Sequence, residues 1–416
     1  MLDFVTKARS AAILTATVLL CGYGVLPLLL AFSYANIDAT SLVVFSVLSA
    51  ASILIGAYLP FGSPRWQWKR LVVDWEVLLG SSWVPFVSFV VVAFMTAEKL
   101  PILAALQGGS REEIAVLREN FLKAREGWQS IFVYLSAAFT GAIIPYTLAL
   151  MFLYKTRLRW FLFAFFLLYS ISFLEKGYFL KGGLPFLYLA AQKRINLPFS
   201  PKFIVVAIVS LLLGVTIASR AGKSGEGSRF FTLAYVPPGA LEFLAWRAVA
   251  VPIVTASDAI RVFEERYGGE PLKGATSSLL ATAFGLERIP FERVVFAEEW
   301  GQNETQTGSA NSVFFTEAYV NFGYLGVIGF GLLAGLLLGM FRRSNDEAFR
   351  SLWMLFSFGI YTAGLIGLLF SNGFILIFLM TVFVKIRVPT KGALQSEGCR
   401  WRMRLKKRQG RVMQDT

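Results

Sequence analysis

The chain has 416 residues, of which 56% are hydrophobic and only 16% are charged, and its formal net charge is +14. Soluble domains carry roughly 25% charged residues, so this composition excludes a soluble globular enzyme. The positive charge does not indicate nucleic-acid binding either, because no compact basic domain carries it. Histidine is absent, which removes the commonest metal ligand and the usual proton carrier at neutral pH.

Long apolar runs without alternation indicate an all-α integral membrane protein, because a spanning helix needs about 20 apolar residues whereas barrel strands show short alternating segments. The runs fall at 11–34, 41–60, 77–97, 129–153, 160–174, 177–191, 203–219, 313–340, 351–370 and 372–384. Two of them, 160–174 and 177–191, are short, and they predict either a hairpin or one long bent helix. Counted as a hairpin, they bring the prediction to about ten transmembrane helices.

The basic residues predict on which side of the membrane each connection lies. Short loops rich in lysine and arginine stay in the cytoplasm, and such loops alternate along the chain, from the region of Lys7 to that of Arg342. Both termini are therefore expected in the cytoplasm. The opposite side then holds two long connections, 98–128 and 220–312.

This arrangement divides the chain into four parts. Residues 1–219 form an N-terminal transmembrane bundle of about seven crossings, and residues 220–312 form a large external loop that is partly helical. Residues 313–384 form the C-terminal transmembrane helices, and residues 385–416 form a basic cytoplasmic tail. The tail is expected to be solvated or bound to lipid headgroups, since basic segments next to a membrane are attracted to anionic lipids.

The first external connection contains a predicted amphipathic helix over residues 109–128. Its apolar residues step by three and four positions, which places them on one helix face suited to a membrane surface; they are Ile114, Leu117, Phe121, Ala124 and Trp128. Arg118 is central in a row of three arginines at seven-residue spacing, each followed by a glutamate. Two interpretations stay open: a solvated face of arginine–glutamate pairs, or an Arg118 that points towards a substrate.

Two helices are expected at the centre of the large loop. The apolar stretch 239–254 is too short to span, and it predicts a helix half-sunk in the membrane interface that ends near Pro252. A second helix is predicted over 256–267, capped by Thr255 or Ser257 and stopped by the glycines that follow it.

Arg247 lies in the first of these helices, where Glu242 is the other charged residue of the apolar run. A guanidinium cannot release its proton, so burying it is costly unless an anion pairs with it. The partner is either Glu242 or another loop glutamate in a structural ion pair, or an anionic ligand. Charges at membrane depth are functional candidates by default, because even lenient scales put their cost at ~2.5–3.5 kcal/mol.

The closing run at 313–340 contains Gly331, Gly335 and Gly339 at four-residue spacing, with Gly323 two turns earlier on the same line. Such a ridge of small residues predicts close packing against another helix. It is a strong structural signal and a weak functional one.

At the outer end of that run, Glu317 and Asn321 are four residues apart and share one helix face, with Tyr319 nearby. Glu317 is a candidate general base if burial raises its pKa, or else a partner for a loop arginine. Lys176 and Lys181, at the turn between the two short runs, are either anchors at the membrane surface or phosphate contacts.

Several chemistries have no residues to carry them. The sequence has no G-x-x-x-x-G-K-[ST] phosphate loop, no histidine–cysteine cluster for zinc or haem, and no histidine to activate a serine nucleophile. What is left is work without metal or nucleotide on a substrate outside the cytoplasm. An anionic lipid-linked substrate held by arginines fits, because an arginine–phosphate pair is bidentate, charge-assisted and worth roughly 1.5–3 kcal/mol.

Four stretches resemble the bacterial O-antigen polymerase (Wzy) family, the oligosaccharide repeat-unit polymerases. They are LPILAALQGGSREEIAVLREN (100–120), EKGYFLKGGLPFLYLAAQKR (175–194), LERIPFERVVF (286–296) and GSANSVFFTEAYVNFGYLGVIGFGLLAGLLLG (308–339). The likeness covers the topology of the whole chain and recognisable motifs over part of it. The arginine spaced ten residues from a glycine in some members has no counterpart here, so that motif is not transferred.

The resemblance implies an enzyme at the periplasmic face of the bacterial inner membrane. It would polymerise undecaprenyl-pyrophosphate-linked oligosaccharide units into a surface polysaccharide, either O-antigen, capsule or exopolysaccharide. Such enzymes use no metal, nucleotide or other cofactor. The implied partners are the lipid-linked substrate, membrane lipids and a chain-length regulator protein, and the loop 220–312 would be periplasmic.

The resemblance also implies site residues. Charge develops on the diphosphate leaving group in the transition state, so arginines that hold it are what this reaction needs. Arg247 and Glu317 are the implied catalytic residues, the glutamate as the base that deprotonates the acceptor hydroxyl. The implied contacts to diphosphate or glycan are Arg118, Arg220, Arg229, Arg293, Lys176, Tyr319 and Asn321.

Two other classes share parts of this pattern. O-antigen ligases have a similar topology but rely on a histidine in the large loop, and this chain has none. A non-enzymatic polysaccharide flippase or transporter is expected to show internal repeats and short loops on both sides, and neither is evident. Both classes stay as alternatives to the polymerase.

Overall fold

The computed structural model describes residues 10–59, 70–122, 125–172, 177–195, 206, 210, 229–235, 237, 239–301, 310 and 312–387. These residues are mostly helical. Six helices are long and apolar enough to cross a membrane: Ala11–Leu30, Ala39–Tyr58, Trp75–Met95, Gly127–Leu153, Ala240–Tyr267 and Phe314–Arg343. The chain is therefore a helical protein with several candidate membrane passes, as the apolar runs predict, while the count of ten stays a prediction.

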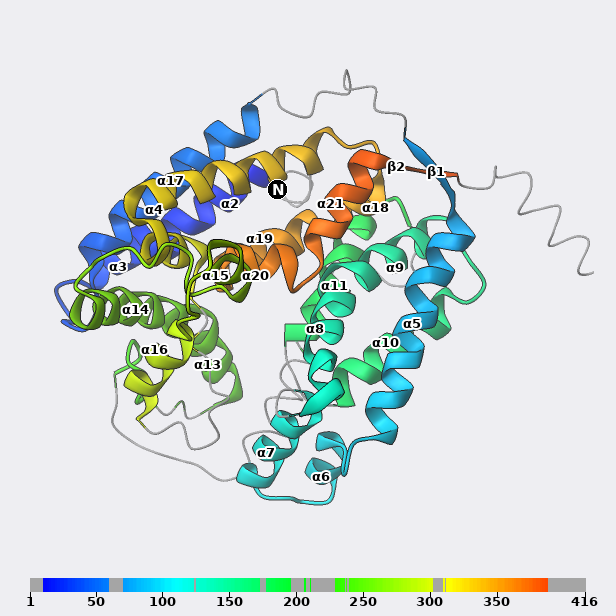
Figure 1. Cartoon of the computed structure of the whole chain (residues 1–416), viewed down its shortest axis with the longest axis horizontal. Helices are drawn as coiled ribbons and strands as arrows, with labels where there is room; N and C mark the ends of the chain where they lie inside the picture. Colours follow the sequence, from blue (N-terminus) through cyan, green and yellow to red (C-terminus); the bar gives the residue numbers. More distant parts are fainter. Residues whose placement is uncertain are drawn as a thin grey trace, which may run out of the picture.

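Two groups of helices make up most of the molecule (Figure 1). One contains α2 (Ala11–Leu19), α3 (Leu26–Leu30), α4 (Ala39–Tyr58) and α17 (Phe314–Arg343). The other contains α5 (Trp75–Met95), α8 (Ile131–Ala138), α9 (Ile144–Leu153), α10 (Arg159–Ser172) and α11 (Gly177–Ala191). The C-terminal helices lie between the two groups, and the helices of the large loop lie beside the first (Figure 1).

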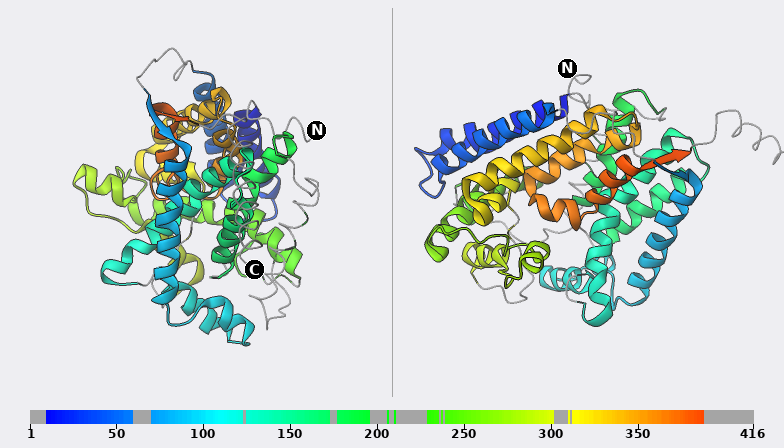
Figure 2. Two further views of the ribbon diagram at one scale, coloured as in Figure 1. Left: turned by 90° about the vertical axis from the view of Figure 1, so that its right-hand side faces the viewer. Right: turned by 45° about the horizontal axis from the view of Figure 1, so that its top comes forward.

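The most extensive helix contact joins α4 and α17, which run alongside each other (Figure 2). A Cβ built on Gly335 would lie 2.1 Å from the carbonyl oxygen of Ile53, and one on Gly339 would lie 2.8 Å from that of Ala57. The predicted glycine ridge is confirmed for these two residues and for Gly331, which packs on the same part of α4. We call this contact, between the three glycines and residues 49–57, the α4–α17 seam.

Gly323 is not part of that ridge, contrary to the prediction. Its φ of 63° and ψ of −154° interrupt α17, and this conformation is essentially restricted to glycine. The nearest neighbour of a Cβ built there is Pro271, at 3.8 Å. α17 therefore consists of a short piece before Gly323 and a long piece after it, and Gly323 sets the angle between them. We call them the outer and the inner piece, after the sides of the membrane predicted for them.

Three of the long helices contain a π-turn: Leu20–Val25, Phe139–Ile143 and Trp246–Ala250. Each π-turn is followed two residues later by a proline, namely Pro27, Pro145 or Pro252. Proline has no N–H to donate, and its ring clashes with the carbonyl four residues back. In each case that carbonyl belongs to the wider π-turn, which accommodates the proline without ending the helix.

The prediction that a helix ends near Pro252 is wrong for this reason. α13 (Ala240–Ala245), the π-turn and α14 (Val251–Tyr267) form one continuous helix. The predicted caps are wrong too, since Ser257 lies inside the helix, where its Oγ accepts a hydrogen bond from the Asp38 N–H at 2.7 Å. The predicted end is confirmed, because Gly268 terminates α14 with a left-handed φ of 63°.

α10 and α11 run antiparallel. Phe163 of α10 packs on Phe186 of α11 with 4.8 Å between ring centroids, and Phe166 lies against Gly182. Along the contact, residue numbers therefore increase in one helix as they decrease in the other. The two short apolar runs form a hairpin rather than one bent helix, and its turn lies outside the described residues.

The apolar run at 351–370 is divided into two helices. α19 (Trp353–Thr362) ends at an extended Ala363, and α20 (Leu365–Phe370) turns back, so that Leu368 packs against Gly359 of α19. α21 (Phe374–Phe383) follows.

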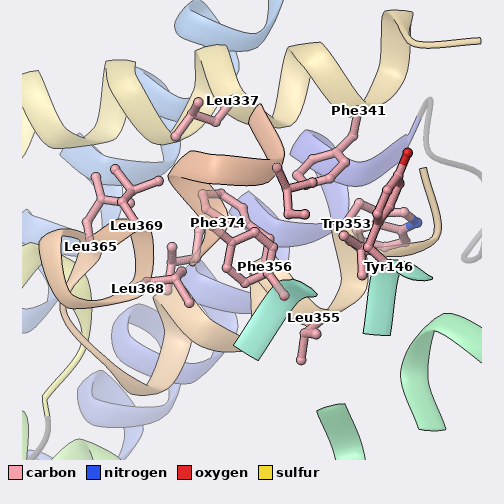
Figure 3. Packing of buried hydrophobic residues seen from close by; sticks show 14 of the residues in the cluster. Tyr146, Leu337, Phe341, Trp353, Leu355, Phe356, Leu365, Leu368, Leu369 and Phe374 are labelled. Atoms are coloured by element: carbon pink, nitrogen blue, oxygen red, sulfur yellow. The ribbon is translucent and has the colours of Figure 1, made fainter. Parts of the chain in front are cut away.

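Aromatic side chains fill the space between α17 and these C-terminal helices (Figure 3). Phe341 of α17 stacks on Phe349 of α18 (Glu347–Ser351) at 4.4 Å between centroids and meets Phe378 of α21 at 5.2 Å. Phe356 of α19 lies 5.8 Å from the same ring. Because all four rings are buried, this core fixes the inner end of α17.

A short parallel sheet pairs β1 (Leu71–Asp74) with β2 (Val384–Arg387). The all-α prediction did not include it. β1 leads into α5 and β2 follows α21, so the sheet ties the second helix group to the end of the described chain. Asp74 and Arg387 add an exposed ion pair at 3.4 Å.

The predicted amphipathic helix of the first external connection is shorter than expected. α7 spans Arg111–Leu122, after the short α6 (Pro101–Leu106). Ile114 and Phe121 share a face as predicted, but that face is buried against the protein instead of lying on a membrane surface. Trp128 is 67% exposed because the helix has already ended. Ala124 lies outside the described residues.

Candidate functional site

Part of the large loop is anchored to the outer piece of α17 by a small apolar core. Phe263 of α14, Val295 of α16 (Phe291–Trp300) and Val320 of α17 are buried together there. α16 is thereby held against α14. Glu299, near the end of α16, consequently lies beside Thr255 of α14.

The kink in α17 is closed by the loop that follows α14. Because Gly323 breaks the helix, the carbonyls of Val320 and Asn321 have no helical donors. The backbone N–H groups of Leu272 and Lys273 donate to them instead, at 3.0 and 2.8 Å. Such pairing is what buried backbone groups need.

Asn321 and Tyr319, two predicted substrate contacts, belong to this anchor. The Asn321 amide donates to Thr276 Oγ1 at 2.7 Å and to the Glu317 carbonyl at 2.8 Å, and the residue is buried. The half-buried Tyr319 ring lies 4.3 Å from the ring of Phe45 on α4. Both side chains therefore position the loop on α17, and a direct contact with substrate stays a prediction.

Glu317 lies at the break between α19 and α20. Its Oε2 accepts a hydrogen bond from the Ile366 N–H at 3.3 Å, and a Cβ built on Gly364 would lie 2.6 Å from that oxygen. A carboxylate at this place accepts hydrogen bonds from the free N–H groups at the start of α20. Its negative charge is also stabilised by the positive end of the helix dipole. Among the described residues, Glu317 forms no ion pair with a loop arginine.

Arg247, in the π-turn before α14, and Arg118, in α7, lie within electrostatic range of each other. Both side chains are exposed, and neither makes a hydrogen bond or ion pair with another residue that the structure describes. The ion pair predicted between Arg247 and Glu242 is not present, because Glu242 accepts a hydrogen bond from Tyr235. Two guanidinium groups within electrostatic range of each other, neither with an ion pair to a described residue, can bind an anionic ligand.

Glu299, near the end of α16, is the carboxylate within electrostatic range of Arg247. Burial raises the pKa of Glu299 to about 7, against the opposing effects of Thr255, Trp300 and Arg247. Its Oε1 is buried and accepts no hydrogen bond from the residues described here. We call Arg118, Arg247 and Glu299 the arginine–glutamate cluster.

The other predicted arginines are placed differently. Arg229 donates from Nη1 to the Ser33 carbonyl at 2.9 Å and lies over the ring of Tyr34, so it holds the loop to the turn after α3. Arg293, on α16, is exposed and has no ion pair with a described residue. Arg220 and Lys176 lie outside the described residues.

A pocket of about 260 Å³ opens beside α7, lined in part by Lys99, Asn120 and Arg125. Arg125 donates to the carbonyls of Phe121 and Ala93 at 2.7 and 2.9 Å and also to side-chain oxygens. Burial lowers the pKa of Arg125. Because its donors are used by the protein, Arg125 fastens α7 to α5 and does not form an anion site.

The sequence interpretation missed Glu299. One position earlier, Glu298 pairs with Arg266, and nothing in the local sequence distinguishes the two glutamates. The two differ because α14 covers Glu299 and leaves Glu298 exposed.

Over the part of the chain that the structure describes, no three acidic or cysteine side chains are grouped so that they could hold a metal ion. The side chains of the arginine–glutamate cluster can bind an anion through the arginines and transfer a proton through the carboxylate. Comparison of the chain with protein-family models, with curated proteins and with solved structures found no match, so the interpretation of the site rests on these residues.

Proposed function

We propose that this protein polymerises undecaprenyl-pyrophosphate-linked oligosaccharide repeat units into a surface polysaccharide at the periplasmic face of the bacterial inner membrane. The observation that carries the proposal is that Arg118 and Arg247 lie within electrostatic range of each other, and that neither forms a hydrogen bond or ion pair with a described residue. A diphosphate joined to a membrane lipid brings two adjacent anionic groups to such a place.

The reaction that fits is a glycosyl transfer without a nucleotide sugar. The acceptor hydroxyl oxygen forms a bond to the anomeric carbon of the donor chain, and the bond from that carbon to the diphosphate oxygen breaks. The electron pair leaves with the lipid diphosphate. Arginines placed on those oxygens stabilise the charge that develops there, each by roughly 1.5–3 kcal/mol.

The proposal includes a topology. Both termini lie in the cytoplasm, ten segments cross the membrane, and the Arg247 helix stays at the periplasmic side. The parallel course of α4 and α17 supports this, because both runs are expected to lead from the periplasm to the cytoplasm. Their inner ends meet, and the Arg343 guanidinium donates to the Ala57 carbonyl at 3.1 Å.

Reporter fusions test the topology. Fusions after Gly239 and after Gly269 flank the helix Ala240–Tyr267, which is long enough to cross a membrane. Both are expected to report the periplasm, with fusions after Arg194 and Arg343 reporting the cytoplasm. Opposite sides for the first two would mean that this helix crosses, and the placement of the cluster would have to be abandoned.

The product distinguishes the three classes. In a bacterium that lacks the protein, we expect surface glycan with one repeat unit per anchor and no long chains. Loss of a ligase would leave long chains on the lipid carrier with none attached, and loss of a flippase would leave units in the cytoplasm. Purified protein should lengthen lipid-linked units in excess chelator and without a nucleotide sugar. A strict requirement for a divalent metal ion or for a nucleotide sugar would contradict the mechanism.

A chain-length regulator is the proposed protein partner, and the basic tail 385–416 is proposed to bind anionic lipid headgroups. Co-purification of the full-length protein with such a regulator, and vesicle binding with and without anionic lipid, test the two proposals.

A further inference from the structure

Three carboxylates of the external helices have a partner in the protein. Asp258 of α14 pairs with Arg261 at 2.9 Å, Glu298 of α16 pairs with Arg266, and Glu242 of α13 accepts from Tyr235. Glu299 differs in one oxygen: Thr255 and Trp300 form hydrogen bonds with its carboxylate, but its Oε1 is buried and has no donor among the described residues.

The fold places Glu299 towards α14. Val295 is fully buried in the core between α14 and α16, and Glu299 follows it by four residues, which is about one helical turn. Glu299 therefore lies on the face that α14 covers, next to Thr255 and Asp258. Glu298 is turned to the solvent-exposed side instead, where it meets Arg266.

A buried carboxylate oxygen without a donor is unfavourable, since leaving it unpaired costs about 1–3 kcal/mol or more for a charged group. Such groups are rare in folded proteins and call for an explanation. A hydroxyl group from a ligand would supply the missing hydrogen bond. Arg247, within electrostatic range of the same carboxylate, would hold the anionic part of that ligand.

We infer that Glu299 is the general base that removes the proton from the acceptor sugar hydroxyl, an inference that rests on the proposed polymerase function. The proton passes from the hydroxyl to the Glu299 carboxylate while the oxygen bonds to the anomeric carbon of the donor. The bond from that carbon to the diphosphate breaks, and the lipid diphosphate leaves with the electron pair. Glu299 then releases its proton to water.

The protonation state of Glu299 suits this task. Its pKa is raised to about 7, chiefly by burial and also by the neighbouring Asp258, while Thr255, Trp300 and Arg247 act to lower it. The best general base has a pKa near the working pH. Glu299 is mostly a carboxylate above pH 7 and mostly a neutral acid below it, so the chemical step should slow as the pH falls.

Glu317, the base implied by the family resemblance, is placed less well for this role. Its Oε2 already accepts from the start of α20, and no arginine of the described loop pairs with it. Glu317 is therefore assigned to structure and Glu299 to proton transfer.

The test uses the full-length protein in lipid nanodiscs with lipid-linked repeat units as substrate. Glu299→Gln keeps the size of the side chain and removes the base, so kcat should fall about 100- to 10,000-fold with KM changed by less than threefold. The matched control is Glu298→Gln, one residue away on the exposed side of α16, which should keep kcat within twofold. Glu299→Asp should recover at least tenfold over the glutamine variant.

The wild-type pH profile is an independent measurement that needs no variant. The rate should fall about tenfold per unit below pH 7 and level off above it. A flat profile between pH 5.5 and 8, or a Glu299→Gln variant within threefold of the wild type, would show that Glu299 is not the general base. Neither result would contradict the proposed polymerase function. Absence of any chain growth by the wild type would instead overturn the proposed function itself.

Discussion

The α4–α17 seam and the arginine–glutamate cluster are built on opposite principles. At the seam, glycines bring two backbones so close that a Cβ at Gly335 would lie 2.1 Å from a carbonyl oxygen. At the cluster, Arg118 and Arg247 lie within electrostatic range of each other and have no hydrogen-bonded partner among the described residues. The first contact is complete within the protein, whereas the second leaves two arginines available to the ligand that we propose.

The difference teaches where this protein can change. A closed helix contact resists any added atom, since interiors are packed as densely as organic crystals. An open polar cluster tolerates shape changes but depends on charge. Substitutions at the two places should therefore have separable effects, on stability at the seam and on catalysis at the cluster.

The largest effect on activity outside Glu299 is expected at Arg247. Arg247→Ala should reduce polymerisation about 10- to 100-fold, because one arginine–phosphate interaction is worth roughly 1.5–3 kcal/mol. Arg247→Lys should restore little, since an ammonium group cannot bind bidentately. The measurement is chain growth by protein that accumulates at the normal level.

The control for Arg247 is Arg266→Ala, which removes an arginine that pairs with Glu298 on the same pair of helices. It should leave activity within twofold. Full activity of Arg247→Ala would show that the cluster is not needed for catalysis. Loss of the protein, instead of its activity, would show that Arg247 contributes to stability, as the seam does.

At the seam, Gly335→Val should destabilise the protein by about 1–3 kcal/mol, because added methyl groups would force the backbones of α4 and α17 apart. The thermal midpoint in detergent measures this. Gly329→Val is the matched control in the same helix, since a Cβ there meets nothing within 4 Å. Equal midpoints for the two variants would show that the seam is looser than described.

The anchor between loop and α17 should give an intermediate effect. Asn321→Ala removes the donor that bonds to Thr276 and to the Glu317 carbonyl. The free energy of unfolding should fall by about 1–3 kcal/mol. Because the anchor fixes the loop, activity should fall together with the thermal midpoint. A loss of activity with an unchanged midpoint would instead favour the predicted substrate contact.

The smallest effect is expected at Arg387. Its pair with Asp74 is exposed at 3.4 Å, and exposed pairs contribute between 0 and about 1 kcal/mol. Arg387→Ala should change neither chain growth nor the thermal midpoint by more than experimental scatter. A large change would mean that the β1–β2 sheet matters more than its exposure indicates.

Periodicity in the sequence was sufficient for features that depend on neighbouring residues. The spacing of Gly331, Gly335 and Gly339 determined the seam on α17, because a small-residue ridge follows from helix geometry alone. The same holds for the buried face of α7 at Ile114 and Phe121, and for the end of α14 at Gly268. The apolar runs likewise determined the helical membrane character.

Tertiary structure alone decided which polar groups are occupied and which are open. The α4–α17 contact left Gly323 outside the ridge, the π-turn carried a helix through Pro252, and the broken α19–α20 segment took up Glu317. Glu298 and Glu299 are adjacent and identical in sequence, yet one pairs with Arg266 and the other is half-buried beside Thr255 of α14. Local sequence carries no record of such partners, because they arrive from segments many residues away and only packing brings them together.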